Sequence, residues 1–410
     1  MNQSHLLLSI LLLTSLCVTA QNDNSMIFVP TSQPSFQVDY ASPTADKPQS
    51  KLWYMENSWW AILPRSSGPS LWQRTEEGWK EHTNVTKSLA GIPGRADVWA
   101  DDRQVTAVGI TDLKKTNHSL SVFQLERKDG FSEICWEATI LTKLFPPSPD
   151  DYIETATIIR DSKGKWWIAA VAGTKVCVWS SSPGGEKWTP PLVLAQRIDN
   201  DDICTITPLP DNKIGVIWSD QIREAILIRE HEDGNPEKLW DQEDVIEIGN
   251  KTADDHLNTS LSKNGTLWVA TKNSVDLVGK PQFVLRERSF TGKWTNMPYV
   301  IKGKMQWQSR PIVVATEDNS IVFSAYGGND RAVPSLVNPV IICGVINTCN
   351  PAILDNPQVI ISPDSIYKSN VQNVTGPRHP FPQGVPWIIL ASDPEGRVYE
   401  ADLRKLIPPK

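Results

Sequence analysis

The sequence is poor in cysteine and histidine, and its body contains no long apolar run. Six cysteines and six histidines in 410 residues are too few for a disulfide-built scaffold, and no Cys–His spacing resembles a zinc site. Basic residues are outnumbered 40 to 47 by acidic ones, and this balance argues against nucleic acid as a partner. Because no segment beyond the first twenty residues offers 18 consecutive apolar residues, we expect no membrane-spanning helix.

Tryptophan and turn-forming residues are abundant. Seventeen Trp stand against nine Phe and seven Tyr, and 23 Gly together with 31 Pro interrupt the chain too often for long helices. With 40% hydrophobic and 21% charged residues, the chain has enough apolar material for a large core, which excludes a disordered protein.

The N-terminus has the pattern of an export signal. An apolar run at residues 6–18 follows a short polar start, and Val18, Thr19 and Ala20 supply small residues for cleavage. We therefore expect a signal peptide at 1–20, a single mature domain at 21–410 and a secreted, extracellular protein. The alternative is a retained N-terminal anchor.

Export permits disulfides and N-linked glycans. Cys343 and Cys349 are close enough in sequence to close a small loop, and we predict that they pair; no pairing is assigned to Cys135, Cys177 and Cys204. Asn258 also precedes a sequon threonine, but it falls inside a predicted strand. The predicted glycosylation sites are Asn84, Asn117, Asn250, Asn264 and Asn373.

A hairpin signal repeats seven times along the chain. Each copy is a short turn rich in Asp, Asn or Gly, followed by an apolar strand. The turns lie at residues 55–57, 100–102, 161–164, 210–212, 263–265, 317–319 and 393–396.

A second signal, consisting of a strand, a polar turn and a Trp, lies between these hairpins. Its Trp residues are separated by 57, 52, 52 and 54 residues. Two hairpins, or four strands, in about 50 residues match the size of a propeller blade. The residues concerned are Trp79, Trp136, Trp188, Trp240 and Trp294.

The repeat predicts an all-β, seven-bladed β-propeller. The seventh hairpin has only two strands, and residues 26–40 have no partner of their own, so the two chain ends are expected to complete one blade together. The alternative is a six-bladed ring with an accessory hairpin, because residues 334–380 lack the turn-Trp element.

Two tandem Trp pairs, Trp59-Trp60 and Trp166-Trp167, place one indole on each face of a strand. We expect at most one indole of each pair to be in the core, which leaves the other as a possible platform for a sugar ring. Most of the Trp residues are expected to fill the wedges between blades.

Charged residues recur where the innermost strand of each predicted blade begins. In a propeller these positions line one mouth of the central channel, where ligands bind. A mouth of mixed charge suits a polar, hydroxyl-rich or anionic ligand, although ordinary solvated loop charges would give the same pattern. The predicted ligand-binding residues are Lys51, Arg95, Glu154, Asp202, Asp255 and Arg310.

The densest cluster is the segment 254–258, with the sequence DDHLN. His256 is the candidate catalytic residue, because imidazole is a general base near neutral pH and adjacent carboxylates would orient it. A structural histidine that bonds neighbouring loops is the alternative. The motif has too few ligands for a metal, so no metal and no cofactor is expected.

Two short stretches resemble known propeller families. SSSPGGEKWT at 180–189 is similar to the Asp-box turn of sialidase-type propellers, with Ser181, Gly185 and Trp188 matching and Pro183 in place of the Asp. The segment 253–270 resembles the Asp-His-Asn strand of secreted BNR-repeat propellers. The resemblance implies a propeller fold and, in relatives that are polysaccharide lyases, a His and a Tyr that act on uronate polymers. His256 matches the former, and no Tyr is assigned by motif.

True sialidases would be expected to show an early Arg-Ile-Pro motif and three arginines around the substrate carboxylate. Gly91-Ile92-Pro93 lacks the arginine, and only Arg95 and Arg310 match the carboxylate-binding role.

Three functions remain open from the sequence. The first is a secreted protein of the sialidase-like superfamily that recognises carbohydrate. The second is a polysaccharide lyase or glycosidase for acidic glycans, with His256 as base and Arg310 or Arg95 neutralising a uronate. The third is a structural extracellular or matrix protein. The expected partner is carbohydrate or acidic polysaccharide, and the expected state is a monomer.

Overall fold

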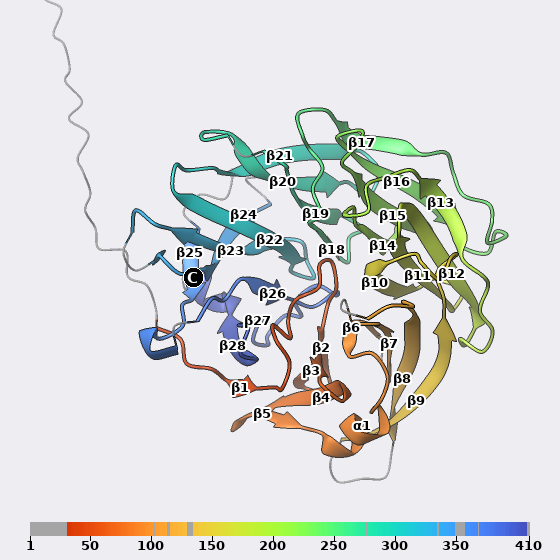
Figure 1. Ribbon diagram of the computed structural model, residues 1–410, viewed down its shortest axis with the longest axis horizontal. Helices are drawn as coiled ribbons and strands as arrows, with labels where there is room; N and C mark the ends of the chain where they lie inside the picture. Colours follow the sequence, from red (N-terminus) through yellow and green to blue (C-terminus); the bar gives the residue numbers. More distant parts are fainter. Residues whose placement is uncertain are drawn as a thin grey trace, which may run out of the picture.

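The computed structural model (Figure 1) describes residues 31–407. Its internal gaps are 102, 113–114, 129–133, 276, 334–335, 349–356 and 368. The predicted signal peptide and Cys349 lie outside the described residues. Within the described ranges, no helix combines the length and the apolar character needed to cross a membrane.

The strands form seven four-stranded antiparallel sheets that surround one axis (Figure 1). The chain is therefore a seven-bladed β-propeller, and the six-bladed alternative is wrong. The described part contains one α-helix, α1 (Thr83–Ser88), and short 3-10 helices at Ser365–Tyr367 and Leu403–Leu406.

Each blade starts next to the axis and ends at the rim. The innermost strands are β2 (Leu52–Met55), β6 (Arg95–Ala100), β10 (Ile153–Arg160), β14 (Cys204–Leu209), β18 (Leu257–Leu261), β22 (Gln306–Ala315) and β26 (Asn373–Thr375). The second strands are β3 (Ser58–Arg65), β7 (Gln104–Ile110), β11 (Lys165–Ala172), β15 (Lys213–Asp220), β19 (Leu267–Lys272), β23 (Ile321–Asp330) and β27 (Ile388–Ser392).

The outer half of the first five blades carries the turn-Trp element of the sequence. The third strands are β4 (Gly68–Thr75), β8 (Leu120–Lys128), β12 (Lys175–Pro183), β16 (Ala225–Glu232), β20 (Pro281–Arg288), β24 (Val340–Asn347) and β28 (Arg397–Asp402). The outermost strands are β5 (Gly78–Glu81), β9 (Cys135–Leu144), β13 (Leu192–Gln196), β17 (Asp244–Ile248), β21 (Trp294–Ile301), β25 (Gln358–Ile361) and β1 (Phe36–Gln37).

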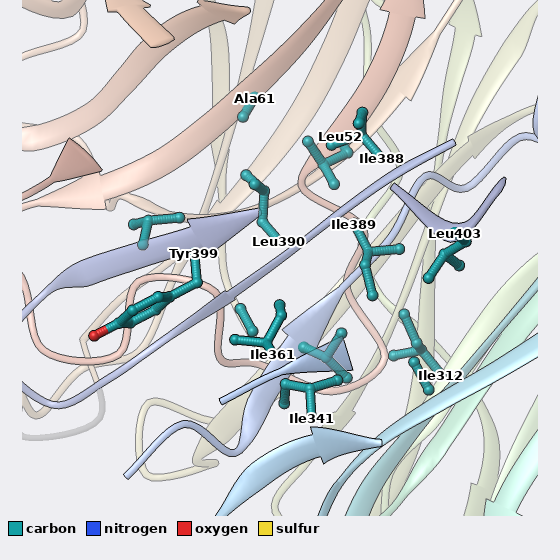
Figure 2. Close-up of a cluster of buried hydrophobic side chains, with 14 of the residues drawn as sticks. Leu52, Ala61, Ile312, Ile341, Ile361, Ile388, Ile389, Leu390, Tyr399 and Leu403 are labelled. Atoms are coloured by element: carbon teal, nitrogen blue, oxygen red, sulfur yellow. The ribbon is translucent and has the colours of Figure 1, made fainter. Parts of the chain in front are cut away.

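The ring closes by joining the two ends of the chain, as predicted. β1 pairs with β28 as the outermost strand of the seventh blade, with Phe36 opposite Val398. Buried side chains of the first, sixth and seventh blades, among them Leu52, Ile341 and Leu390, form one apolar cluster across this closure (Figure 2). Closure removes the open sheet edges that would otherwise remain.

The seventh hairpin is not equivalent to the other six. Its turn at 393–396 joins β27 to β28, the second and third strands, whereas each of the other turns joins the first strand to the second. The innermost strand of this blade is β26, which lies in the segment that the sequence assigned to the sixth blade. The prediction that this hairpin contains the first two strands of its blade was wrong, because the true first strand has only three residues and lies in a Pro-rich segment.

Both indoles of each tandem Trp pair are buried, so the prediction of at most one core indole per pair was wrong. Trp60 packs edge-on against Trp136 of the next blade at 5.4 Å, and Trp59 packs against Phe381 on the other face at 6.0 Å. Trp167 meets Trp240 in the same way at 5.7 Å. A blade has a neighbour on each side, so both faces of its strands belong to a core. These Trp residues fill inter-blade wedges and present no face to a sugar.

Polar side chains cap the inner edge of one blade by accepting from the backbone of the next. Ile206 N–H donates to Thr157 Oγ1 at 3.0 Å, and Val313 N–H donates to Asn258 Oδ1 at 3.0 Å. The first strand of a blade has no ladder partner on its channel side, so its free N–H groups need such acceptors.

One ion pair crosses the channel and ties several blades together. Arg378, in the connection between β26 and β27, donates to both carboxylate oxygens of Asp97 on β6 at 2.7 and 2.8 Å. Asp97 is fully buried and also accepts from the backbone N–H groups of Ser50 and Ile158. Burial raises the pKa of Asp97, and the Arg378 charge opposes that rise.

The predicted modification sites differ in accessibility. Four of the five predicted glycosylation sites are exposed, but Asn373 lies in β26 and is 6% exposed, so the folded chain cannot present it for a glycan. Cys343 is buried on β24 and Cys349 lies outside the described residues, so their pairing stays a prediction. The exposed sites are Asn84, Asn117, Asn250 and Asn264.

Removing Arg378 should destabilise the ring. We expect Arg378→Met to lower the free energy of unfolding by about 3–5 kcal/mol, because it leaves the Asp97 carboxylate buried without its countercharge. The double variant Asp97→Asn/Arg378→Met should lose less than the single variant, since no charge stays buried. Urea unfolding followed by Trp fluorescence measures both. Equal losses in the single and double variants would contradict this account.

Candidate functional site

One end of the channel, the mouth, is covered by a loop that the sequence did not single out. This mouth loop (residues 41–50) runs from β1 towards the axis and back to β2, and Figure 1 shows it as the red trace that reaches the neighbourhood of β18. Gln49 Nε2 donates to Ala156 O at 3.0 Å, and Asn258 Nδ2 donates to Pro48 O at 3.3 Å. The loop is therefore bonded to the third and fifth blades.

Asp46 of the mouth loop forms a closed charge cluster with two predicted site residues. Arg95 donates to Asp46 Oδ1 through Nε at 2.8 Å and through Nη2 at 2.5 Å, and Lys51 Nζ lies 3.3 Å from Asp46 Oδ2. Burial alone would raise the pKa of Asp46, but the two cations lower it overall. Lys51 and Arg95 are at the mouth, as predicted, but they are buried and hold the loop, so they have no free charge for a ligand.

The rest of the mouth carries charges that are partly open to solvent. Lys47 of the mouth loop pairs with Asp255. Burial raises the pKa of Glu154, the nearby Asp255 and Asp201 carboxylates raise it further, and Lys47 opposes them. Among the described residues, the Glu154 side chain has no hydrogen-bond partner. The mouth therefore brings together side chains from the mouth loop and from the third, fourth and fifth blades.

Arg310 approaches the same charges from the sixth blade. Burial lowers its pKa, and the carboxylates of Asp255, Glu154 and Asp254 oppose that shift. Its guanidinium forms no ion pair with any described residue, and its hydrogen bond from Nη1 to Ser309 Oγ is long, at 3.5 Å. Of the predicted cations, Arg310 is the one left without an anionic partner in the described part of the chain.

Arg310 also has a strained backbone. Its φ of 58° lies in the left-handed region, and Pro311 follows, which disfavours helical backbone at the preceding residue. The pairing of β22 with β23 is irregular here, since Ser309 faces Gly327 and the next paired residue, Ile312, faces Ala325. Such a bulge turns side chains out of the ladder, here towards the mouth.

His256 is held from both ring nitrogens. Its Nδ1 lies 2.6 Å from Asp254 Oδ1 and is also in contact with Asp255, while its Nε2 lies 2.9 Å from Ser309 Oγ. Because Nδ1 faces carboxylate oxygens, it carries the ring proton, and Nε2 is left to accept from the Ser309 hydroxyl. These contacts fit both predictions made from the sequence, an oriented general base and a structural histidine that bonds neighbouring segments.

The prediction for Asp202 was wrong in its role. Asp202 accepts from the backbone N–H of Asp199 at 2.8 Å and of Gln221 at 3.1 Å, and it is buried within its own loop. Its neighbour Asp201 is exposed and interacts electrostatically with Asp255 and Lys47. A shift of one residue turns a side chain to the other side of an extended chain, so the alignment of strand starts selected the wrong aspartate.

Several mouth residues were not predicted from the sequence. Asp46 and Lys47 belong to the mouth loop, and Ser309 precedes the strained Arg310. Tyr152 stands at the start of β10, is 38% exposed, and interacts electrostatically with Glu154 and Arg95. The Arg310-Pro311 step before an apolar run could have indicated the irregular backbone next to Ser309. No sequence pattern indicates Asp46, because its partner Arg95 is distant in sequence.

The acidic cluster does not offer a free set of metal ligands. Asp254, Asp255 and His256 bring three potential ligand atoms within 4.8 Å of one another. These atoms are already bonded to one another, and Lys272 and Lys47 neutralise the two carboxylates. The cluster fits a charge-balanced histidine site better than a cation site.

The opposite end of the channel holds a cavity of about 940 Å³, lined in part by Tyr54 and by the exposed ring of Phe290. Its charged groups pair with one another, Arg160 with Asp101 at 2.8 Å and Lys263 with Glu317 at 2.7 Å. Of the two ends of the channel, the mouth is the one whose described charged groups include some without an ion-pair partner, so we place the candidate functional site there.

Comparisons with known proteins found similarity in overall fold only. No family model matches the chain, and no curated protein matches it. An α-L-arabinanase from Penicillium chrysogenum, solved with arabinobiose, is 12% identical over 79% of this chain and all of that chain, with a TM-score of 0.47. A protein of unknown function from Dyadobacter fermentans is 10% identical over 91% of this chain and 98% of that chain, with a TM-score of 0.46.

A Trypanosoma rangeli sialidase in complex with sialic acid is 9% identical over 77% of this chain, with a TM-score of 0.45. The match spans 58% of that sialidase, less than two thirds of its length. At these identities the similarity concerns the fold, and no substrate follows from it.

The buried Asp202 should make stability depend on pH. Burial raises its pKa to about 6, against about 4 in the unfolded chain, so the unfolded state ionises first as the pH rises. Between pH 4 and pH 6 this costs the folded state up to about 3 kcal/mol. Asp202→Asn removes the titration and should gain up to that amount relative to wild type between pH 4 and pH 7.

Urea unfolding at a series of pH values measures this difference. The exposed Glu76→Gln serves as control and should keep a constant difference from wild type across the same range. A pH-independent difference for Asp202→Asn would show that Asp202 ionises normally in the folded protein.

Proposed function

We propose that the protein is a secreted, carbohydrate-recognising propeller that binds an acidic sugar at the mouth. The observation that carries the proposal is the Arg310 guanidinium, which is partly buried and has no carboxylate partner among the described residues. Guanidinium groups bind carboxylates through two parallel hydrogen bonds, so a uronate or similar acidic sugar would supply the missing partner.

The neighbours of Arg310 suit the rest of a sugar ring. The carboxylates of Glu154 and Asp201 are acceptors for sugar hydroxyl groups, and neither has a cation within ion-pair distance among the residues that the structure describes. The exposed ring of Tyr152 supplies an apolar face against which a pyranose can stack. A ligand with one carboxylate and several hydroxyl groups matches this mixture better than a polyanion, which the carboxylates would repel.

Cleavage of the bound sugar is a second candidate, favoured by the orientation of His256. Its Nε2 is the basic nitrogen of the cluster and accepts from the Ser309 hydroxyl, and Arg310 lies on the other side of that hydroxyl. In a lyase, His256 would remove a proton next to the uronate carboxylate while Arg310 neutralises the developing charge. Such a reaction releases an unsaturated product that absorbs ultraviolet light.

The binding proposal is tested with uronate-containing and neutral oligosaccharides. We expect Arg310→Ala to weaken binding of the acidic ligands by about 10- to 100-fold, the range for a lost charge-assisted hydrogen bond, and to leave binding of neutral ones nearly unchanged. Isothermal titration calorimetry measures the affinities. Lys238→Ala, which removes the same charge at the rim of the fourth blade, is the matched control.

Other results would redirect the assignment. Equal effects of Arg310→Ala and Lys238→Ala would show that only net charge matters and would remove the specific role of Arg310. Absence of any glycan binding by the folded wild-type protein, together with co-purification of a matrix protein, would favour the structural role.

A further inference from the structure

The mouth contains a serine that the proposed carbohydrate recognition does not use. Ser309 Oγ lies 2.9 Å from His256 Nε2, and His256 Nδ1 lies 2.6 Å from Asp254 Oδ1. The three side chains come from two neighbouring blades and form one continuous chain of hydrogen bonds. A hydroxyl, a ring nitrogen that takes its proton, and a carboxylate on the second ring nitrogen together make up an activated serine nucleophile.

The orienting end of this chain is fixed. Lys272 Nζ donates to Asp254 Oδ2 at 2.8 Å, and Ser274 Oγ, which donates to Ala253 O at 2.8 Å, lies 3.3 Å from the same oxygen. These contacts leave Oδ1 of Asp254 for the imidazole. Ser309 and His256 are 4% and 5% exposed, so bulk water does not compete for their hydrogen bonds.

The backbone around Ser309 is the irregular part of β22. The serine is the last regularly paired residue before the bulge, and the left-handed Arg310 follows directly. A strained turn beside a nucleophile lifts its oxygen away from the sheet, as a nucleophile elbow does. Strain of this kind is observed at functional sites more often than elsewhere.

Arg310 adds a group that stabilises negative charge. Its Nη1 lies 3.5 Å from Ser309 Oγ, and the guanidinium has no anionic partner among the described residues. An oxyanion that forms on a carbon bonded to Ser309 Oγ would develop within reach of this cation.

We propose that Ser309, His256 and Asp254 form a hydrolytic triad that removes small acyl groups, such as acetyl, from the hydroxyls of a carbohydrate bound at the mouth. The inference rests on the proposed function for its substrate class. An acyl carbon is the electrophile that suits a serine oxygen and an imidazole, because the tetrahedral intermediate carries its charge on one oxygen near Arg310.

The reaction consumes one water and releases one carboxylic acid. Ser309 Oγ forms a bond to the ester carbonyl carbon and gives its proton to His256 Nε2. The ester C–O bond then breaks, and His256 returns the proton to the sugar oxygen that leaves. Water next attacks the acyl-serine and gives a proton to His256. The C–O bond to Ser309 then breaks, His256 returns the proton to Ser309 Oγ, and acetic acid and the free serine result.

The experiment uses the full chain and three readouts: labelling by a fluorophosphonate probe, hydrolysis of p-nitrophenyl acetate, and acetate release from O-acetylated uronate oligosaccharides. We expect mass spectrometry to find the probe on Ser309 of the wild type. Ser309→Ala and His256→Ala should each lower acetate release at least about 100-fold while circular dichroism still shows the wild-type fold. Ser162→Ala, at an exposed turn on the opposite end of the channel, is the control and should keep full activity.

The result separates this inference from the binding proposal. If the wild type binds acidic oligosaccharides but takes up no probe and releases no acetate, the triad is overturned and recognition stands. If Ser309 is labelled and model esters are hydrolysed without any affinity for acidic sugars, the triad stands and the acidic-sugar assignment fails. Undiminished acetate release by a folded Ser309→Ala would also overturn the triad.

Discussion

The ion pair between Asp97 and Arg378 fixes how the blades meet at the axis. Asp97 accepts from Arg378 and from the backbone of Ser50 and Ile158, so one carboxylate joins the first strands and connections of four blades. Two buried charges recover little more than their desolvation cost, so the pair contributes less to stability than its geometry suggests. Its effect is to specify arrangement, since a blade rotated about the axis would leave one of these charges or N–H groups unsatisfied.

The mouth contains two groups of charged residues, which differ in whether their charges are paired. Around Asp46 the charges of Lys51 and Arg95 are satisfied, and the mouth loop is held in place. Around Arg310 the charges are left open, and the backbone strain there costs about 1–3 kcal/mol. The packing of the adjacent Ile312 into the core that spans the ring closure offsets this cost. The paired charges around Asp46 thus hold the mouth loop in place, and the groups around Arg310 keep hydrogen-bonding capacity for a ligand.

The sequence predicted the fold because its signals are local. A turn followed by an apolar strand, and in five blades a Trp in or just before the outermost strand, predict the four-stranded unit without knowledge of distant contacts. The same reasoning failed where contacts with a neighbouring blade decide which side chains are buried, or where a strand is very short. Trp59 and Trp60 are both core because blades flank both faces, and β26 was hidden because three residues leave no periodicity.

The site was predicted in part for the same reason. His256, Glu154 and Arg310 were found because first strands begin at the mouth, a rule that needs only the strand order. Asp202 was chosen over Asp201 because a rule accurate to two residues cannot decide which way a side chain points. Asp46 could not be predicted as a site residue, because its partner Arg95 is 49 residues away and the loop that carries Asp46 has no recognisable sequence motif.

Partly buried groups without partners are the energetic basis of the binding proposed at the mouth. The free protein has already removed part of the hydration of Arg310 and Glu154, and no described residue replaces it with an ion pair. A ligand that supplies a carboxylate and hydroxyl groups therefore gains their hydrogen bonds without the full desolvation cost that an exposed pair would incur. The groups around Asp46 are held by one another, so the same ligand would gain nothing there. The difference between the two groups, rather than the total number of charges, would confine the proposed binding to the side of the mouth where His256 and Ser309 lie.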